Sequence, residues 1–149
     1  MAKLNPDRYL ALDVGDRRVG VAAGSLEAGM ARPIETWDRK IMSEKEIVRR
    51  LRELVKDEKA ATVVVGDPLN MDGTIGPRAE ISRAFAEWVG RIVRQVNVVM
   101  ADERLSSFSA DEVMERRGLK GPKRKSMRDA YAAAVILEEY FAALRQEEE

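Results

Sequence analysis

The stretch from Tyr9 to Ala23 decides the fold, and it consists of Tyr9-Leu10-Ala11-Leu12-Asp13-Val14-Gly15-Asp16-Arg17-Arg18-Val19-Gly20-Val21-Ala22-Ala23. Two apolar runs rich in strand-forming residues flank a short polar segment that contains Gly15-Asp16, a pair typical of tight turns. The polar segment is too short to hold a crossover helix, so the two runs are predicted to pair as an antiparallel hairpin.

Strands and helices are predicted to alternate along the rest of the chain. A third strand is expected around residues 31–37, where Pro33 indicates an edge position. Continuous apolar runs at residues 62–65 and 96–101 predict buried parallel strands. Capping residues, a proline start and helical apolar spacing predict four helices, beginning at Ser43, Pro77, Ser109 and Ser126. The order predicts an α/β fold over residues 1–149 as a single domain, with a mixed sheet and helices on its faces.

The composition limits which catalytic and metal-binding groups the chain can use. The chain has 149 residues and contains neither cysteine nor histidine. Disulfides, thiolate zinc sites, cysteine nucleophiles and imidazole ligands are therefore excluded, and any bound metal must be a hard ion held by oxygen atoms. No apolar run is long enough to span a bilayer, and the polar N-terminus lacks the apolar core of a secretory signal. A cytoplasmic protein without membrane contact is expected.

Three acidic residues occupy positions where α/β proteins commonly form ligand-binding and active sites. Asp13 lies among apolar residues within the first strand, Glu103 directly follows the strand at 96–101, and Asp129 is expected in the first turn of the last helix. Sites in open α/β sheets form at the carboxyl ends of neighbouring strands. Converging carboxylates repel one another unless a cation neutralises them, so the acids predict a magnesium or manganese site.

Each acid also has a structural explanation. Asp13 could stabilise the Gly15 turn, Asp129 could complete a capping box with Ser126, and Glu103 could pair with Arg104. Asp102 precedes Glu103, and because side chains alternate along a strand, only one of the two should face the site.

The charge distribution suggests a nucleic-acid partner. The chain carries 26 basic and 26 acidic residues, and this balance argues against nonspecific coating of nucleic acid. However, residues 116–128 hold seven basic residues and no acidic one. Such runs most often form a solvated surface, but this one is predicted as a loop leading directly to Asp129. Candidate phosphate contacts are Arg17, Arg18, Arg104, Lys123, Arg124, Lys125 and Arg128.

Four ordered motifs carry a family resemblance. They begin at Asp13 (Asp-Val-Gly-Asp-Arg-Arg-Val-Gly-Val-Ala), Val65 (Val-Gly-Asp-Pro-Leu-Asn-Met-Asp-Gly-Thr), Asp102 (Asp-Glu-Arg-Leu-Ser-Ser) and Asp129 (Asp-Ala-Tyr-Ala-Ala-Ala-Val-Ile-Leu). A hairpin of the first kind also opens ATP-binding kinases and actin-like proteins, but the later motifs distinguish the families. Together, from about Tyr9 to Phe141, they resemble the YqgF (RuvX) family of RNase H-like nucleases.

The resemblance implies an RNase H-like fold related to the junction resolvase RuvC, and a metal-dependent nuclease. The substrate is expected to be RNA, such as the precursor of small-subunit ribosomal RNA, or branched DNA, or both. The family's catalytic and metal-binding acids correspond to Asp13, Glu103 and Asp129. In the expected two-metal hydrolysis, Asp13 bridges two Mg²⁺ or Mn²⁺ ions about 4 Å apart, and each of the other two acids holds one. The sequence leaves open whether the chain forms a homodimer.

Two positions depart from the family pattern. Asp67 replaces a residue that is usually apolar, and it is expected to face solvent. Ala132 stands where RuvC has a further acid, so a second ion is expected to bind loosely or only with substrate. A non-catalytic module that binds nucleic acid or the ribosome remains the alternative function. An ATP-dependent phosphotransferase would need a second phosphate loop and a longer chain.

Overall fold

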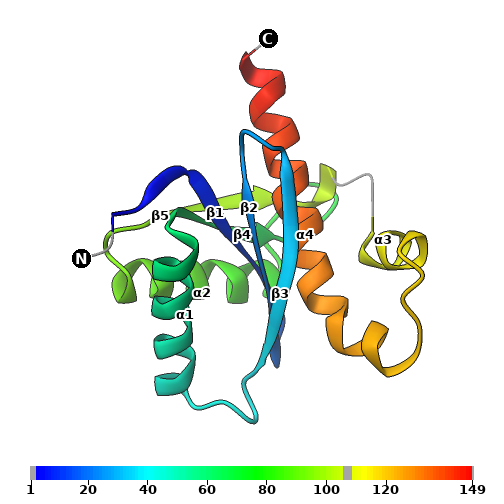
Figure 1. Ribbon diagram of the computed structural model, residues 1–149, viewed down its shortest axis with the longest axis horizontal. Helices are drawn as coiled ribbons and strands as arrows, with labels where there is room; N and C mark the ends of the chain where they lie inside the picture. Colours follow the sequence, from blue (N-terminus) through cyan, green and yellow to red (C-terminus); the bar gives the residue numbers. More distant parts are fainter. Residues whose placement is uncertain (1–2, 106–108, 149) are drawn as a thin grey trace.

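The computed structural model describes residues 3–105 and 109–148, and Figure 1 shows their arrangement around a five-stranded sheet. The strand order is β3-β2-β1-β4-β5. The elements follow one another as β1 (Asn5–Val14), β2 (Arg18–Ser25), β3 (Met30–Asp38), α1 (Glu44–Glu58), β4 (Ala60–Asp67), α2 (Pro77–Ile92), β5 (Asn97–Asp102), the short 3₁₀ helix η1 (Glu103–Leu105), α3 (Ala110–Arg116) and α4 (Gly121–Glu148). The predicted mixed sheet with flanking helices is confirmed.

The hairpin forms as its sequence predicts. β1 and β2 are antiparallel, with Asp13 opposite Gly20, and the Gly15 N–H closes the turn by donating to the Arg18 carbonyl at 2.8 Å. β3 adds to the outer side of β2 and is an edge strand, as Pro33 indicates. On the other side β4 is parallel to β1, and β5 is parallel to β4.

The helices cover the two faces of the sheet separately (Figure 1). One apolar cluster joins α1 and α2 to side chains such as Leu12 and Val65. The other joins α4 to side chains such as Ala11 and Val64. Since these strand residues are sequence neighbours, the alternation of side chains along β1 and β4 decides which helix each residue meets. None of the helices in the described ranges is long and apolar enough to cross a membrane.

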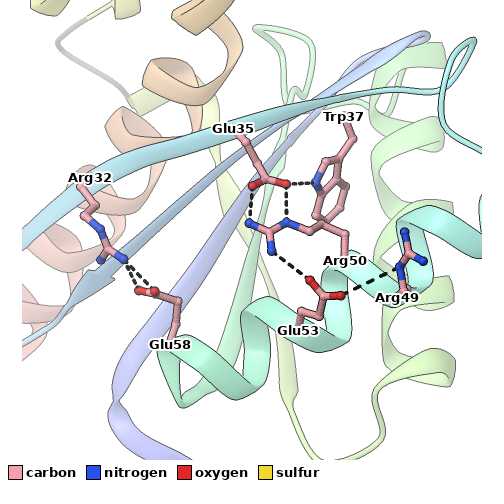
Figure 2. A network of polar contacts seen from close by, with 7 residues as sticks. All are labelled: Arg32, Glu35, Trp37, Arg49, Arg50, Glu53 and Glu58. Carbon is pink, nitrogen blue, oxygen red and sulfur yellow. Dashed lines mark hydrogen bonds and ion pairs between the residues drawn. The ribbon is translucent and has the colours of Figure 1, made fainter.

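The outer strand β3 is tied to α1 by polar contacts (Figure 2). Glu35 accepts hydrogen bonds from Arg50 Nε at 2.8 Å and from the Trp37 indole at 2.7 Å, and Arg32 pairs with Glu58 at 2.6 Å. These contacts fix the orientation of β3, with Glu35 and Trp37 on the α1 side.

Two sequence predictions about the C-terminal half were wrong. The last helix begins at Gly121 rather than at Ser126, because Gly121 adopts a left-handed φ of +64° and Pro122 is preorganised for a first helical turn. The Ser126 hydroxyl instead donates to the Lys123 carbonyl at 3.0 Å within the helix. The basic residues from Lys123 onward therefore lie on a helix and not in a loop. The other error concerns β5, which is half-buried because it is the second edge of the sheet.

Candidate functional site

The strand register places Asp13 and Glu103 on the same face of the sheet. Asp13 is two residues beyond Ala11, and Glu103 two beyond Ala101; both alanines pack in the apolar cluster of α4. Because Leu12 pairs with Val65 and Gly66 with Ala101, Gly66 lies between the two acids, on β4. The acids thus flank a residue without a side chain, on the face that α4 covers.

Two glycines create the space for the acidic side chains. A Cβ atom on Gly66 would lie 2.8 Å from Glu103 Oε1, so the carboxylate occupies the position that a side chain would fill. A Cβ atom on Gly20 would lie only 1.9 Å from the Asp129 carbonyl oxygen. The α4 backbone therefore rests directly on β2 at this point. Since Gly20 pairs with Asp13, this contact brings Asp129 to the side of Asp13 opposite Glu103.

The electrostatics show that Asp13 is the central acid. Burial raises the pKa of Asp13 to about 6, and the charge of Asp129 adds to this effect. Burial also raises the pKa of Glu103 to about 7, and the charge of Asp13 is the next cause. Asp13 thus experiences a like charge on each side. Such an arrangement favours binding of a cation, which would relieve the repulsion.

Asp129, unlike Asp13 and Glu103, forms an ion pair: Arg18 Nε lies 2.9 Å from its carboxylate. Within residues 3–105 and 109–148, no three acidic side chains lie close enough together to hold one ion. The donors that are present are nonetheless carboxylate oxygens, which hard divalent cations prefer. Asp13 and Glu103 offer such oxygens from one face of the sheet, and Arg18 engages only one of the two carboxylate oxygens of Asp129.

Asp102 lies on the other face of the sheet, as strand alternation predicts. Its carboxylate accepts hydrogen bonds from the guanidinium of Arg104, the shortest at 2.8 Å, and from the Arg104 backbone N–H at 2.9 Å, and these bonds lower its pKa. Of the two consecutive acids Asp102 and Glu103, only Glu103 lies on the same face of the sheet as Asp13.

The expectation that Asp67 faces solvent was wrong. Asp67 is only 4% exposed, and its carboxylate pairs with Arg83 of α2 at 2.7 Å. β4 is an interior strand, so a side chain at its end meets a covering helix rather than water. Asp67 lies on the face opposite Asp13, although its charge still contributes to the raised pKa of Glu103.

Most of the predicted phosphate contacts are paired with acidic side chains. The pairs are Arg17–Asp38 at 2.9 Å, Arg18–Asp129 at 2.9 Å, Arg104–Asp102 at 2.8 Å, Arg124–Glu115 at 2.6 Å and Arg128–Asp111 at 2.8 Å. Lys123 and Lys125 are exposed on the first turns of α4. A phosphate could engage most of these arginines only by sharing or displacing a carboxylate.

Arg78 is a cation near the acids that sequence reasoning missed. It is the second residue of α2 and is exposed, and its charge lowers the pKa of both Asp13 and Glu103. Among the described residues, it has no acidic partner within 4.0 Å. One signal could have revealed it: α2 starts just after the carboxyl end of β4, at the sheet edge where Asp13 and Glu103 were expected.

The comparisons with known proteins agree with this architecture. A family model described as RuvX, Holliday junction resolvase, matches residues 7–143. Relatives named as candidate pre-16S rRNA nucleases include one from Chloroflexus aurantiacus, 39% identical over 95% of this chain and 91% of its own. Another, from Bacillus cytotoxicus, is 42% identical over 89% of this chain and 96% of its own.

Similar solved structures include Thermus thermophilus RuvC in complex with a Holliday junction substrate, with a TM-score of 0.57, 17% identity and coverage of 93% of this chain and 95% of that one. The fowlpox virus resolvase in complex with Holliday junction DNA also has a TM-score of 0.57, at 11% identity, covering 92% of this chain and 98% of that one. At these identities the likeness concerns the fold alone.

The sheet, its covering helices and the resolvase neighbours define an RNase H-like fold. Within that class the chain belongs to the RuvX family, whose model covers nearly all of it.

Proposed function

We propose that this chain is a divalent-metal-dependent nuclease that hydrolyses phosphodiester bonds in ribosomal RNA precursor, with Asp13, Glu103 and Asp129 as its catalytic acids. The observation that carries the proposal is the pair of half-buried acids, Asp13 and Glu103, on one face of the sheet. Burial and the charge of Asp129 raise the pKa of Asp13 to about 6, and burial and the charge of Asp13 raise that of Glu103 to about 7. The names of the relatives favour RNA precursor as the substrate. The description of the family model favours a four-way DNA junction as a second candidate.

The proposed roles follow from position. Asp13 and Glu103 would hold the first Mg²⁺ or Mn²⁺ ion, and Asp129 would contribute its other carboxylate oxygen to a second ion. Bound ions of this kind activate a water molecule and stabilise the charge on the leaving oxygen. Arg18, which pairs with Asp129, and Arg78, at the start of α2, would bind the phosphate beside the acids. Because Asp13 and Glu103 are partly buried, bulk water screens their charges less than it would at the surface.

A cleavage assay with matched substitutions tests the proposal. Labelled precursor RNA, single-stranded RNA and a four-way DNA junction are incubated with the protein and magnesium or manganese. Cleavage should require the added ion and stop in EDTA. Asp13→Asn and Glu103→Gln should abolish turnover, whereas Asp102→Asn, the control on the opposite face, should retain most of it. Equal losses at Glu103 and Asp102 would contradict the assignment, and cleavage in EDTA would contradict metal dependence.

The same assay decides the alternative function. A non-catalytic binding module would bind these nucleic acids but leave them intact with either ion. The preferred RNA role predicts faster cleavage of precursor RNA than of the junction, and the reverse order would favour the junction.

A further inference from the structure

The loop between β4 and α2 exposes two large apolar side chains. In the described part of the chain, four large hydrophobic residues are exposed: Met30, Ile41, Met71 and Ile75. Met71, at 84% exposed, and Ile75, at 48%, both belong to residues 70–76, which we call the apical loop. A single exposed apolar residue needs no explanation, but two in one short loop indicate a contact surface.

Hydrogen bonds hold the apical loop in one conformation. The Asn70 N–H donates to the Thr74 carbonyl at 2.9 Å, and the Gly73 N–H donates to the Asn70 carbonyl at 2.8 Å. The Asn70 side chain donates to the Thr74 hydroxyl at 2.8 Å, and Asp72 accepts from the Thr74 N–H at 3.0 Å. Met71 therefore extends into solvent from a braced turn, and a partner that binds it loses little loop entropy.

The apical loop is also joined to the segment that carries Glu103. Arg104 donates to the Met71 carbonyl at 3.3 Å, while Asp102 fixes the same guanidinium at 2.8 Å. On its other side the loop continues directly into the first turn of α2, which carries Arg78. Met71 and Ile75 thus lie on a rigid platform connected on both sides to residues of the candidate site.

We propose that Met71, supported by Ile75, contacts nucleobases that are unpaired or unstacked beside the scissile phosphate. This inference rests on the proposed nuclease function and deepens it. Apolar side chains such as methionine and isoleucine can insert between bases and unstack them. A thioether also packs favourably on an aromatic ring. Every base presents a π face, so this contact would select unpaired structure rather than a sequence.

The test measures base unstacking and affinity with an RNA that contains 2-aminopurine. All proteins carry Asp13→Asn, so that the RNA stays intact. The RNA is offered single-stranded, with one unpaired bulge, and as a full duplex, and a four-way DNA junction with the probe at its branch forms a separate arm. The parent protein should increase probe fluorescence on bulged RNA. Met71→Ala should lose this increase and bind bulged RNA roughly tenfold more weakly, which corresponds to partial burial of one methionine side chain.

Matched variants separate this role from general effects. Met30→Ala removes the same kind of side chain from β3, where Met30 is 63% exposed. This variant should change neither the probe fluorescence nor the affinity for bulged RNA. Met71→Leu should keep the affinity of the parent. Since no charge is removed, the slope of affinity against salt should stay constant.

The outcomes distinguish this inference from the function on which it rests. If Met71→Ala matches the parent on bulged RNA and on the junction, the inference is overturned, whatever the cleavage assay shows. A response confined to the junction would support the base contact and assign it to DNA. Absence of cleavage by the unsubstituted chain would overturn the proposed function, and a Met71 effect on binding would still be measurable.

Discussion

Replacing Gly20 by alanine should separate α4 from the sheet and move Asp129 away from Asp13. The added Cβ would lie 1.9 Å from the Asp129 carbonyl oxygen, 2.2 Å from its carbonyl carbon and 2.9 Å from the Ala130 nitrogen. All three are backbone atoms, so no side-chain rotation can relieve the clash. To restore ordinary contact, the strand and helix must separate by about 1.5 Å at this point.

The displacement sets the expected magnitudes. Overpacking of this kind costs about 1–3 kcal/mol of folding free energy. Misplacement of a catalytic group by about 1 Å can reduce the rate by roughly 100-fold. Gly20→Ala should therefore remain folded but lose about two orders of magnitude in single-turnover cleavage with manganese, while RNA affinity changes little. Urea denaturation measures the stability, and cleavage at saturating protein measures the rate.

Two further glycine variants provide the comparison. Gly90 lies inside α2, and in Gly90→Ala the new Cβ lies 3.8 Å from Val98 of β5, an ordinary contact, so stability should rise by about 0.5–1 kcal/mol and cleavage should not change. Gly66→Ala meets the movable ends of Glu103 and Ile136 at 2.8 Å, so it should cost less stability than Gly20→Ala but still slow cleavage. If Gly20→Ala and Gly90→Ala cleave equally fast, close approach of α4 is not what positions Asp129. If Gly20→Ala cannot fold, Gly66→Ala alone decides whether the glycines shape the site.

Three other predictions concern charged residues. Since the folded protein raises the pKa values of Asp13 and Glu103, it binds protons more tightly than the unfolded chain, so the stability of the metal-free protein should fall as pH rises through about 6 to 7. Urea denaturation at pH 5 and pH 8 measures this fall, Asp13→Asn should reduce it, and an unchanged profile in that variant would contradict the coupling. Replacing Lys123, Arg124 and Lys125 by alanine should weaken binding of every nucleic acid alike and flatten the salt dependence by about one unit of log-log slope for each phosphate interaction removed. Arg78→Ala should instead slow cleavage at saturating substrate, and an effect on affinity alone would make Arg78 an ordinary backbone contact.

The local structure of the N-terminal half could be predicted from the sequence because it depends on short-range chemistry. Gly15 and the two apolar runs specify the hairpin, Pro33 specifies the edge strand, and Ser43 with Glu46 forms the capping box that begins α1. Each feature requires only neighbouring residues. The start of α4 was misjudged because two signals compete there: Ser126 resembles a cap, but Gly121-Pro122 begins the helix first.

The candidate site was harder to predict because it depends on which face of the sheet each side chain meets. Alternation correctly separated Asp102 from Glu103. The same rule could not place Asp67, because the sequence does not show that Arg83 lies opposite it on α2. Arg78 was missed for a related reason, since its neighbours in space are far from it in the sequence. Several ion pairs of the predicted phosphate contacts likewise join residues far apart in the sequence, such as Arg18 with Asp129 and Arg17 with Asp38.

The two faces of the sheet have different electrostatic arrangements. On the α2 side, Asp67 and Asp102 each have an arginine partner within 2.8 Å, so their charges are already neutralised. On the α4 side, Asp13 and Glu103 face each other across Gly66. Among the described residues, Arg78 is the cation whose charge lowers the pKa of both acids, while Arg18 pairs with Asp129. A strand shifted by one residue would exchange these two sets of acids. The register fixed by the hairpin and the parallel strands therefore also selects the face on which the proposed divalent cation would bind, and this is the face where glycines let α4 bring a third acid.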